Sequence, residues 1–167
     1  MSLVIRPATP EDCPTIVAHI RELAFYEKLE HEMVATADQF RQHLFGPRPV
    51  IEAVMAEWAG EPAGFALFFT NFSTFLGKPG LYLEDLYVRE KYRRKGIGKA
   101  LISSLAKIAV DREYGRFEWS VLDWNAPAIA FYRSIGAIGM DEWTVQRLTG
   151  EPLDRLASTA PPIAGNS

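Results

Sequence analysis

A short basic run that contains two glycines has the composition of an anion-binding loop. Glycine lets the backbone curl and approach a ligand closely, and the free N–H groups and dipole of a helix start favour an anion. A strand is expected before the run and a helix after it, so the run would open that helix. Its residues are Arg93, Arg94, Lys95, Gly96, Ile97, Gly98 and Lys99. They predict a cradle for a pyrophosphate, and the alternative is a loop with glycine turns and surface lysines.

Two common phosphate-binding motifs do not match this run. A dinucleotide-binding fingerprint needs a third small residue at the position of Leu101. A Walker A loop needs Ser or Thr after its lysine, whereas Ala100 follows Lys99. The run therefore belongs to neither motif.

Two segments together resemble the GNAT acetyltransferase superfamily. The first is Arg93-x-x-Gly96-x-Gly98, which follows an expected strand and resembles the acyl-CoA signature of that family. The second runs from Asn125 through Tyr132 to residue 136, in the order that the family has, with an expected strand between the two. The resemblance covers residues 3–148. It implies the GNAT fold, an α/β arrangement with a mixed central sheet, antiparallel N-terminal strands and helices on both faces.

Four further blocks resemble one branch of the superfamily, the diamine (spermidine/spermine) and thialysine acetyltransferases. They are Val4-Ile-Arg-Pro-Ala-Thr9, Glu22-Leu-Ala-x-Tyr26-Glu27, Tyr82-Leu-Glu84-Asp85 and Trp124-Asn125-x-Pro127. The branch implies direct transfer of an acetyl group from acetyl-CoA to the primary amine of a small cationic substrate, which is a polyamine, a diamine or a lysine-like amine. It also implies a homodimer, and the aromatic residues and expected strand near Trp143 are able to pair.

The reaction that the resemblance implies gives three residues expected catalytic roles. A primary amine with a pKa near that of lysine, about 10.4, arrives as ammonium, so a group must accept its proton. Glu84 is the candidate, acting directly or through a water. The resemblance implies that the backbone N–H of Leu86, freed by a strand bulge, faces the developing oxyanion. It also implies that Tyr132 donates a proton to the departing CoA thiolate.

The resemblance implies two binding regions of opposite charge. CoA is expected to add to strand residues Leu86, Tyr87 and Val88, with its phosphates in the cradle and with contacts from Asn125, Tyr132 and Arg133. The cationic amine calls for an acidic, partly aromatic mouth, for which the candidates are Tyr26, Glu27, Glu84, Asp85 and Trp124. The alternatives are a salt bridge for Asp85, a solvated turn for Glu27, and core packing for Tyr132 and Trp124.

The composition limits the other classes of function. A chain of 167 residues predicts one domain, which we place at residues 1–157, and a small, polar, proline-bearing tail at residues 158–167. The net charge of -3 argues against bulk nucleic-acid binding. The lone Cys13 and three widely spaced histidines argue against a disulfide and a metal site. No apolar run is long enough for a membrane span, and we expect a cytoplasmic protein.

Hydrophobic periodicity and capping residues predict the order β-α-α-β-β-β-α-β-α-β. We expect strands at residues 3–6, 51–58, 63–70, 81–88, 117–122 and 144–148, with an aromatic loop at 72–79. Helices are expected to begin at residues 9, 36, 98 and 125 and to end near 26 or 29, 46, 112 and 136, with one helical turn at 152–157.

Two other functions compete with a small-molecule acetyltransferase. One is a GNAT enzyme that acetylates a protein or peptide amine. The net negative charge of the chain and the block around Tyr26 favour a small cationic substrate over a protein or peptide. The other is a CoA-binding sensor without catalysis. The presence of both Glu84 and Tyr132 argues against the sensor.

Overall fold

The computed structural model describes residues 2–165, and the chain divides into two compact units, residues 1–120 and 121–167. Each unit is described by itself. The single domain predicted over residues 1–157 stays a prediction. Residues 166 and 167 of the predicted tail lie outside the described residues.

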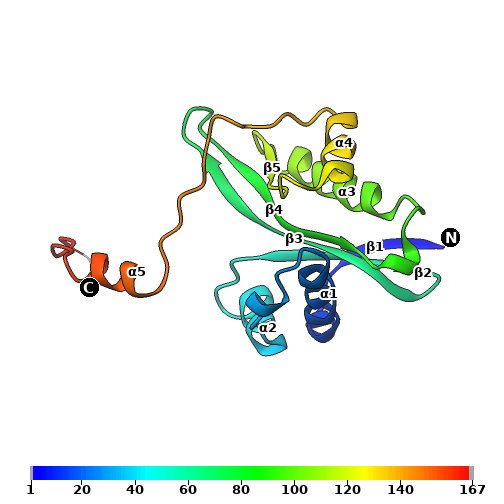
Figure 1. The fold of residues 1–167 in the computed structure, drawn as a ribbon, viewed down its shortest axis with the longest axis horizontal. Helices are drawn as coiled ribbons and strands as arrows, with labels where there is room; N and C mark the ends of the chain where they lie inside the picture. Colours follow the sequence, from blue (N-terminus) through cyan, green and yellow to red (C-terminus); the bar gives the residue numbers. More distant parts are fainter. Residues whose placement is uncertain (1, 166–167) are drawn as a thin grey trace. The chain divides into compact units, whose positions relative to one another are not determined.

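The first unit is built on one sheet of five strands (Figure 1). The strands are β1 (Leu3–Pro7), β2 (Glu52–Trp58), β3 (Glu61–Ser73), β4 (Lys78–Val88) and β5 (Phe117–Trp119). They lie side by side in chain order; β1 to β4 pair antiparallel, whereas β4 and β5 pair parallel. This arrangement confirms the predicted mixed sheet. The predicted aromatic loop at 72–79 is shorter than expected, because residues 74–77 form the turn of the β3–β4 hairpin and the residues on either side belong to the two strands.

Three α-helices cover the two faces of this sheet. Helices α1 (Cys13–Tyr26) and α2 (Ala37–Phe45) lie on one face and α3 (Ile97–Asp111) lies on the other (Figure 1). The core beneath α1 includes Cys13, Ile16, Met55 and Phe65. On the opposite face, α3 buries Ile97, Leu101 and Leu105, which recur every four residues along one side of the helix. The structure confirms the prediction of helices on both faces.

Helix α2 begins at the capping box that its sequence predicts. The backbone N–H of Gln39 donates to the Thr36 hydroxyl at 3.3 Å, and the Thr36 N–H donates to the Gln39 side-chain oxygen at 2.9 Å. Two N–H groups near the helix start thereby gain acceptors.

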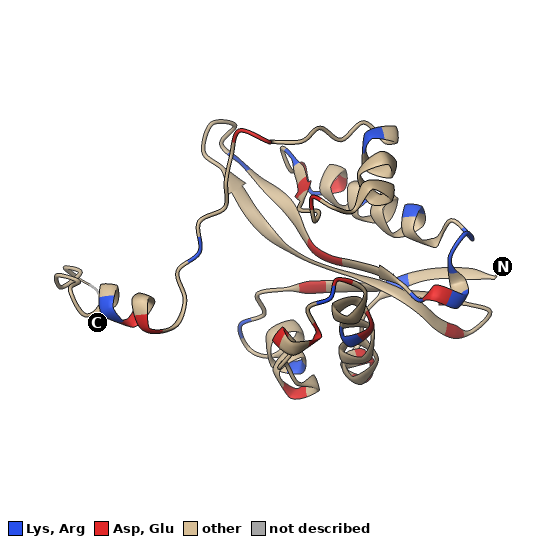
Figure 2. Ribbon diagram, viewed as in Figure 1, with Lys and Arg blue, Asp and Glu red and all other residues tan. Residues whose placement is uncertain are grey.

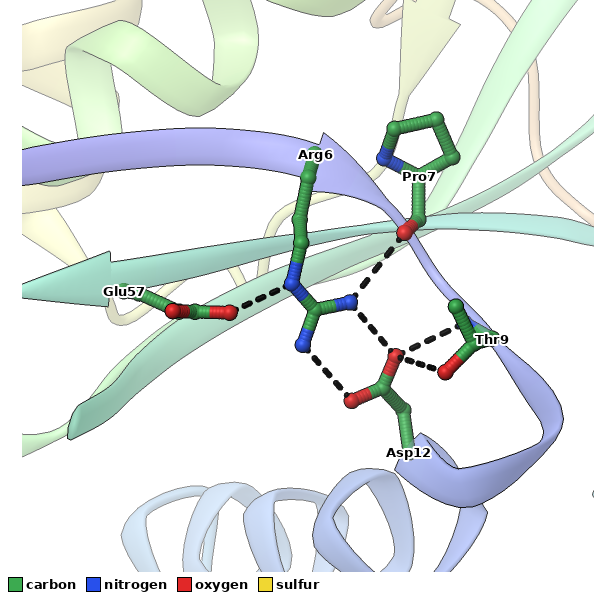
Figure 3. Close-up of polar contacts among 5 residues, drawn as sticks. All are labelled: Arg6, Pro7, Thr9, Asp12 and Glu57. Atoms are coloured by element: carbon green, nitrogen blue, oxygen red, sulfur yellow. Dashed lines mark hydrogen bonds and ion pairs between the residues drawn. The ribbon is translucent and has the colours of Figure 1, made fainter. Parts of the chain in front are cut away.

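An ion-pair network ties β1 and β2 to the start of α1 (Figure 3). Arg6 donates to the two oxygens of Asp12 at 2.7 and 2.9 Å, and it also pairs with Glu57 on β2. Asp12 accepts the backbone N–H of Thr9 at 2.7 Å. Asp12 ends a 3-10 turn, Pro10–Asp12, that leads directly into α1. Its carboxylate therefore fixes the direction in which the chain leaves the sheet and enters the helix that borders the candidate site.

The described residues of the second unit, 121–165, form two helices. They are α4 (Ala126–Ser134), where the Asn125 side chain accepts the Ala128 N–H at 3.4 Å, and α5 (Gly150–Ala157). The predicted turn at 152–157 is thus a longer helix. The predicted strand at 144–148 is wrong, because these residues pair with no strand in the described chain and Val145 is 81% exposed. An extended segment without a ladder partner has no hydrogen bonds that define a strand.

No helix in the described part of the chain has the length and apolar character needed to cross a bilayer.

The Arg6–Asp12 pair yields a test of stability. Asp12→Asn removes the bidentate charge pair and should lower the free energy of unfolding by about 2 kcal/mol. Arg6 lowers the pKa of Asp12, so this stabilisation should be present above about pH 4 and be lost as the pH falls through the lowered pKa. Urea unfolding at pH 7 and pH 3 measures both effects.

The control for that test is Asp38→Asn, since Asp38 pairs with Arg41 across an exposed helix surface. Exposed pairs contribute little, so this variant should unfold nearly as the wild type does. Equal unfolding energies for the Asp12 variant and the wild type at pH 7 would contradict the anchoring role.

Candidate active site

A β-bulge on β4 lies at the two carboxylates that the sequence singled out. Leu67 on β3 pairs with Asp85, but the next residue, Phe68, pairs with Leu83, so Glu84 has no partner in the ladder. The extra residue shifts the alternation of side chains along the strand. Glu84 is exposed, whereas Asp85 is half-buried and shares a sheet face with Leu67. Without a bulge, the consecutive Glu84 and Asp85 would face opposite sides of the sheet.

Beyond the bulge, one edge of β4 has no strand beside it in the first unit. Strand β5 pairs with β4 only from Leu81 to Leu83. The Arg89 N–H donates to the Ala63 carbonyl at 2.8 Å, while Val88 lies opposite Gly64. This pattern marks Val88 as a position whose N–H and C=O point away from β3.

Leu86 lies two residues before Val88 and opposite Ala66, so its backbone groups have the same orientation. The N–H groups of Leu86 and Val88 therefore face the open edge of β4. An extended ligand is able to add there as a further strand would.

The predicted cradle lies between this edge and α3. Gly96 has φ +76° and stands at the N-cap of α3, where it supplies no side-chain cap. Ala100 donates to the Gly96 carbonyl at 3.0 Å, so the N–H groups of Ile97, Gly98 and Lys99 precede the first intrahelical bond. A Cβ built on Gly98 would meet only Val88 Cγ2, at 3.8 Å. Packing within the protein therefore does not require glycine at 98.

The basic side chains around the cradle do not all point to one place. Arg93 donates its Nε to the Val88 carbonyl at 3.1 Å and lies over the rings of Tyr26 and Tyr87, at 5.4 and 5.8 Å from their centroids. Lys95 lies over the Trp58 ring at 4.9 Å. Arg94 and Lys99 are exposed. Figure 2 shows acidic residues partway along β4 and basic residues in the loop that leads to α3.

Asp85 has an environment of carboxylates. Burial, followed by the negative charges of Glu84 and Glu27, raises the pKa of Asp85 to about 6. Burial also raises the pKa of Glu27. Asp85 forms no ion pair with any described residue, so the salt bridge considered for it is absent. A cluster of acids without a cation within the protein is arranged to receive a positively charged group.

Near this cluster lie two residues that the sequence did not predict for the site, His19 and Arg89, and two that it named for other reasons, Glu22 and Tyr87. Burial and a hydrogen bond to Glu22 raise the pKa of Tyr87 to about 12, and Glu22 also pairs with Arg89 at 3.3 Å. His19 is buried between the Phe65 and Tyr87 rings, its Nδ1 has no partner in the described chain, and burial lowers its pKa. Helical spacing of His19 and Glu22 on the side of α1 that faces β4 was the available signal.

Four predicted site residues belong to the second unit. Trp124 is exposed, Asn125 caps α4, and the Tyr132 ring lies 5.7 Å from that of Phe131. Arg133 donates to the Ala137 carbonyl at 3.2 Å. The roles predicted for these residues in binding and catalysis stay predictions.

Comparison with known proteins decides the family. The family model described as "Acetyltransferase (GNAT) family" matches residues 15–137. The chain belongs to the GNAT acetyltransferase family. This GNAT chain is 37% identical to a thialysine N-epsilon-acetyltransferase of Sus scrofa, over 93% of the chain and 98% of that protein. It is 36% identical to an L-ornithine N5-acetyltransferase of Arabidopsis thaliana, over 91% of the chain and 86% of that protein.

A solved structure shares the fold. An integron cassette protein from the mobile metagenome of V. cholerae superimposes with a TM-score of 0.80 at 28% identity, covering 95% of this GNAT chain and 99% of that one. These likenesses confirm both the GNAT resemblance and the fold predicted from the sequence.

The raised pKa of Asp85 predicts the acidic side of the pH–rate profile. If a cationic amine binds against ionised Asp85, kcat/KM should fall as the pH drops below about 6, which is the pKa of this carboxyl in the free protein. Asp85→Asn should remove this limb. Initial rates with a saturating acyl donor over pH 5 to 8 measure it.

The variant Glu84→Gln distinguishes, in the same assay, which of the two carboxylates gives rise to the acidic limb of the pH–rate profile. Glu84 helps to raise the pKa of Asp85, so this variant should move the limb to lower pH and retain it. Loss of the limb in Glu84→Gln, with retention in Asp85→Asn, would assign it to Glu84 instead.

Proposed function

We propose that this protein is an acetyl-CoA-dependent N-acetyltransferase that transfers an acetyl group directly to a primary amine of a small cationic substrate. The observation that carries the proposal is the order of features along β4 and its exit. An acidic bulge at Glu84 and Asp85 is followed at once by the open edge at Leu86 and Val88, and then by the cradle at Gly96 and its neighbours. A cation site and an anion site thus lie on either side of an unpaired strand edge.

The residues of the first unit fit acetyl-CoA. The N–H groups of Ile97, Gly98 and Lys99 would hold the pyrophosphate, assisted by the dipole of α3. The backbone of Leu86 and Val88 would pair with the amide groups of pantetheine. When bound, acetyl-CoA supplies an activated thioester. The Leu86 N–H would then donate to the oxygen that gains negative charge as the amine attacks.

The amine would enter from the side of the carboxylates. At neutral pH, Asp85 is ionised because its pKa of about 6 lies below 7. It would hold the ammonium together with Glu84 and Glu27 and accept a proton, directly or through a water. The pKa of Asp85, about 6, lies near neutrality and so suits the role of a general base. Tyr132 would return a proton to the thiolate, and Tyr26 and Trp124 would border the mouth.

The printed names of the relatives support the substrate class. A thialysine N-epsilon-acetyltransferase and an L-ornithine N5-acetyltransferase both act on the side-chain amine of a small amino acid. We also propose that the protein is a homodimer, as the branch resemblance implies.

The cradle is tested by two substitutions at Gly98. Gly98→Glu places a negative charge where the pyrophosphate would lie and should weaken acetyl-CoA binding at least about tenfold. Alanine and glutamate are both better helix formers than glycine, and a first-turn acid suits the helix dipole, so the fold should persist. Calorimetry with acetyl-CoA measures the affinity.

Gly98→Ala is the matched control, since its Cβ makes only an ordinary contact. It should bind acetyl-CoA nearly as the wild type does. If Gly98→Glu bound with wild-type affinity, the pyrophosphate would lie elsewhere.

The activity itself is tested by CoA release in the presence of acetyl-CoA and a panel of amines. We expect thiol release and an acetylated product with small cationic amines, and Tyr132→Phe should reduce kcat about a hundredfold while acetyl-CoA affinity stays near that of the wild type. No thiol release with any amine would reject the enzymatic function. Release with peptide amines alone would reject the small-molecule substrate.

A further inference from the structure

The side chain of Arg93 contacts the end of β4 and the end of α1. Its Nε donates to the Val88 carbonyl at 3.1 Å, and its guanidinium carbon lies 5.4 and 5.8 Å from the ring centroids of Tyr26 and Tyr87. Arg93 also lines a groove between the second half of α1 and the end of β4. The structure therefore surrounds this guanidinium with residues of α1 and β4, although the sequence motif assigns Arg93 to the phosphates.

The Tyr87 ring and the cradle lie at opposite faces of the sheet. Tyr87 belongs to the core cluster beneath α1, whereas Val88 Cγ2 is the atom that a Cβ on Gly98 of α3 would meet. Neighbouring side chains of a strand point to opposite faces, and α1 and α3 cover opposite faces of this sheet (Figure 1). A guanidinium that lies over Tyr87 is thus on the α1 side of β4, away from the first-turn N–H groups of α3.

The carbonyl that Arg93 holds belongs to the open edge of β4. Val88 C=O points away from β3, beyond the last residue that pairs with β5, so this strand end has a neighbouring strand on one side only. The Arg93 N–H donates to the Glu90 carbonyl at 3.2 Å and closes the 3-10 turn Glu90–Tyr92, which returns the Arg93 side chain toward the strand. A carbonyl oxygen has two lone pairs, so Val88 is able to accept a donor from an extended ligand while Arg93 stays in place.

We propose that Arg93 is a positioning residue, which holds the end of β4 in the conformation to which the pantetheine part of acetyl-CoA adds, and that it does not bind the phosphates. This inference rests on the proposed acetyl transfer and deepens it, because it divides the basic run between two tasks. The first-turn N–H groups of α3 hold the pyrophosphate, whereas Arg93 directs the Val88 carbonyl to the edge. An acetyl donor without phosphates therefore depends on Arg93 as strongly as acetyl-CoA does.

The test compares acetyl donors with and without phosphates. S-acetylpantetheine carries the thioester and the amide groups of acetyl-CoA and no phosphate, whereas ADP represents the phosphate half alone. Arg93→Met removes the donor and the charge but keeps a long, flexible side chain. By thiol release with one small cationic amine, it should lower kcat/KM about tenfold for both acetyl donors.

The affinity of the same variant for ADP, measured by calorimetry, should stay within about twofold of the wild type. Its melting temperature should also stay near that of the wild type, because Arg93 is exposed. A merely structural defect would lower the melting temperature or weaken the binding of both halves of the cofactor, so these two measurements distinguish it from a positioning role.

Arg48→Met is the matched control, since Arg48 is also exposed and does not line the groove; it should leave kcat/KM unchanged for both donors. Gly98→Glu opposes the phosphates and should lower kcat/KM more for acetyl-CoA than for S-acetylpantetheine. The same pattern in Arg93→Met, with weaker ADP binding, overturns the inference and makes Arg93 a phosphate ligand. Wild-type activity of Arg93→Met with both donors, or weaker binding of both halves, also overturns it. Absence of thiol release by the wild type with any amine overturns the proposed function itself, which is a distinct result.

Discussion

The organisation of the first unit depends on one strand edge that has no neighbouring strand beyond Leu83. Backbone N–H and C=O groups normally find partners, and a strand edge without a partner invites pairing with another chain. Here β5 pairs with β4 only as far as Leu83. Beyond that point, the backbone groups of Leu86 and Val88 point away from β3 toward an edge without a neighbouring strand in the first unit. The bulge at Glu84 begins where this pairing ends. The edge separates the acidic cluster from the cradle.

Rigid elements hold this edge in place. The Arg6–Asp12–Glu57 network fixes the start of α1 to β1 and β2. At its other end, α1 contacts the residue that follows β4 through the Glu22–Arg89 ion pair. Sites placed on such anchored elements keep their geometry better than sites on loops. The carboxylates and the open edge therefore lie on a scaffold rather than on a flexible segment.

Much of this architecture is readable from the sequence because its signals are local. Thr36 and Gln39 form a capping box, and Gly96 and Gly98 open a helix, through spacings of a few residues. The predicted strand at 144–148 is wrong because residues with a strand preference, such as Thr144 and Val145, form a strand only when a partner strand is present. The bulge at Glu84 and the burial of Asp85 follow from cross-strand register, which the order of residue types does not reveal. For the same reason, the Glu22–Arg89 pair, which joins a helix to a distant strand end, was missed.

Ionisation of Asp85 within the acidic cluster lowers the free energy of unfolding of the protein. Asp85 titrates near pH 6 in the folded protein and near 3.8 in the unfolded chain, so the folded state binds protons more tightly over that interval. The free energy of unfolding contributed by this group consequently declines as the pH rises from about 4 to 6, and at neutral pH the fold lacks stability that a protonated Asp85 would provide. A bound cation would stabilise the ionised form of Asp85, which burial and the charges of Glu84 and Glu27 disfavour, without any change in pH. A positively charged ligand bound at this carboxyl group would therefore also stabilise the fold, and the folded population would grow with ligand concentration.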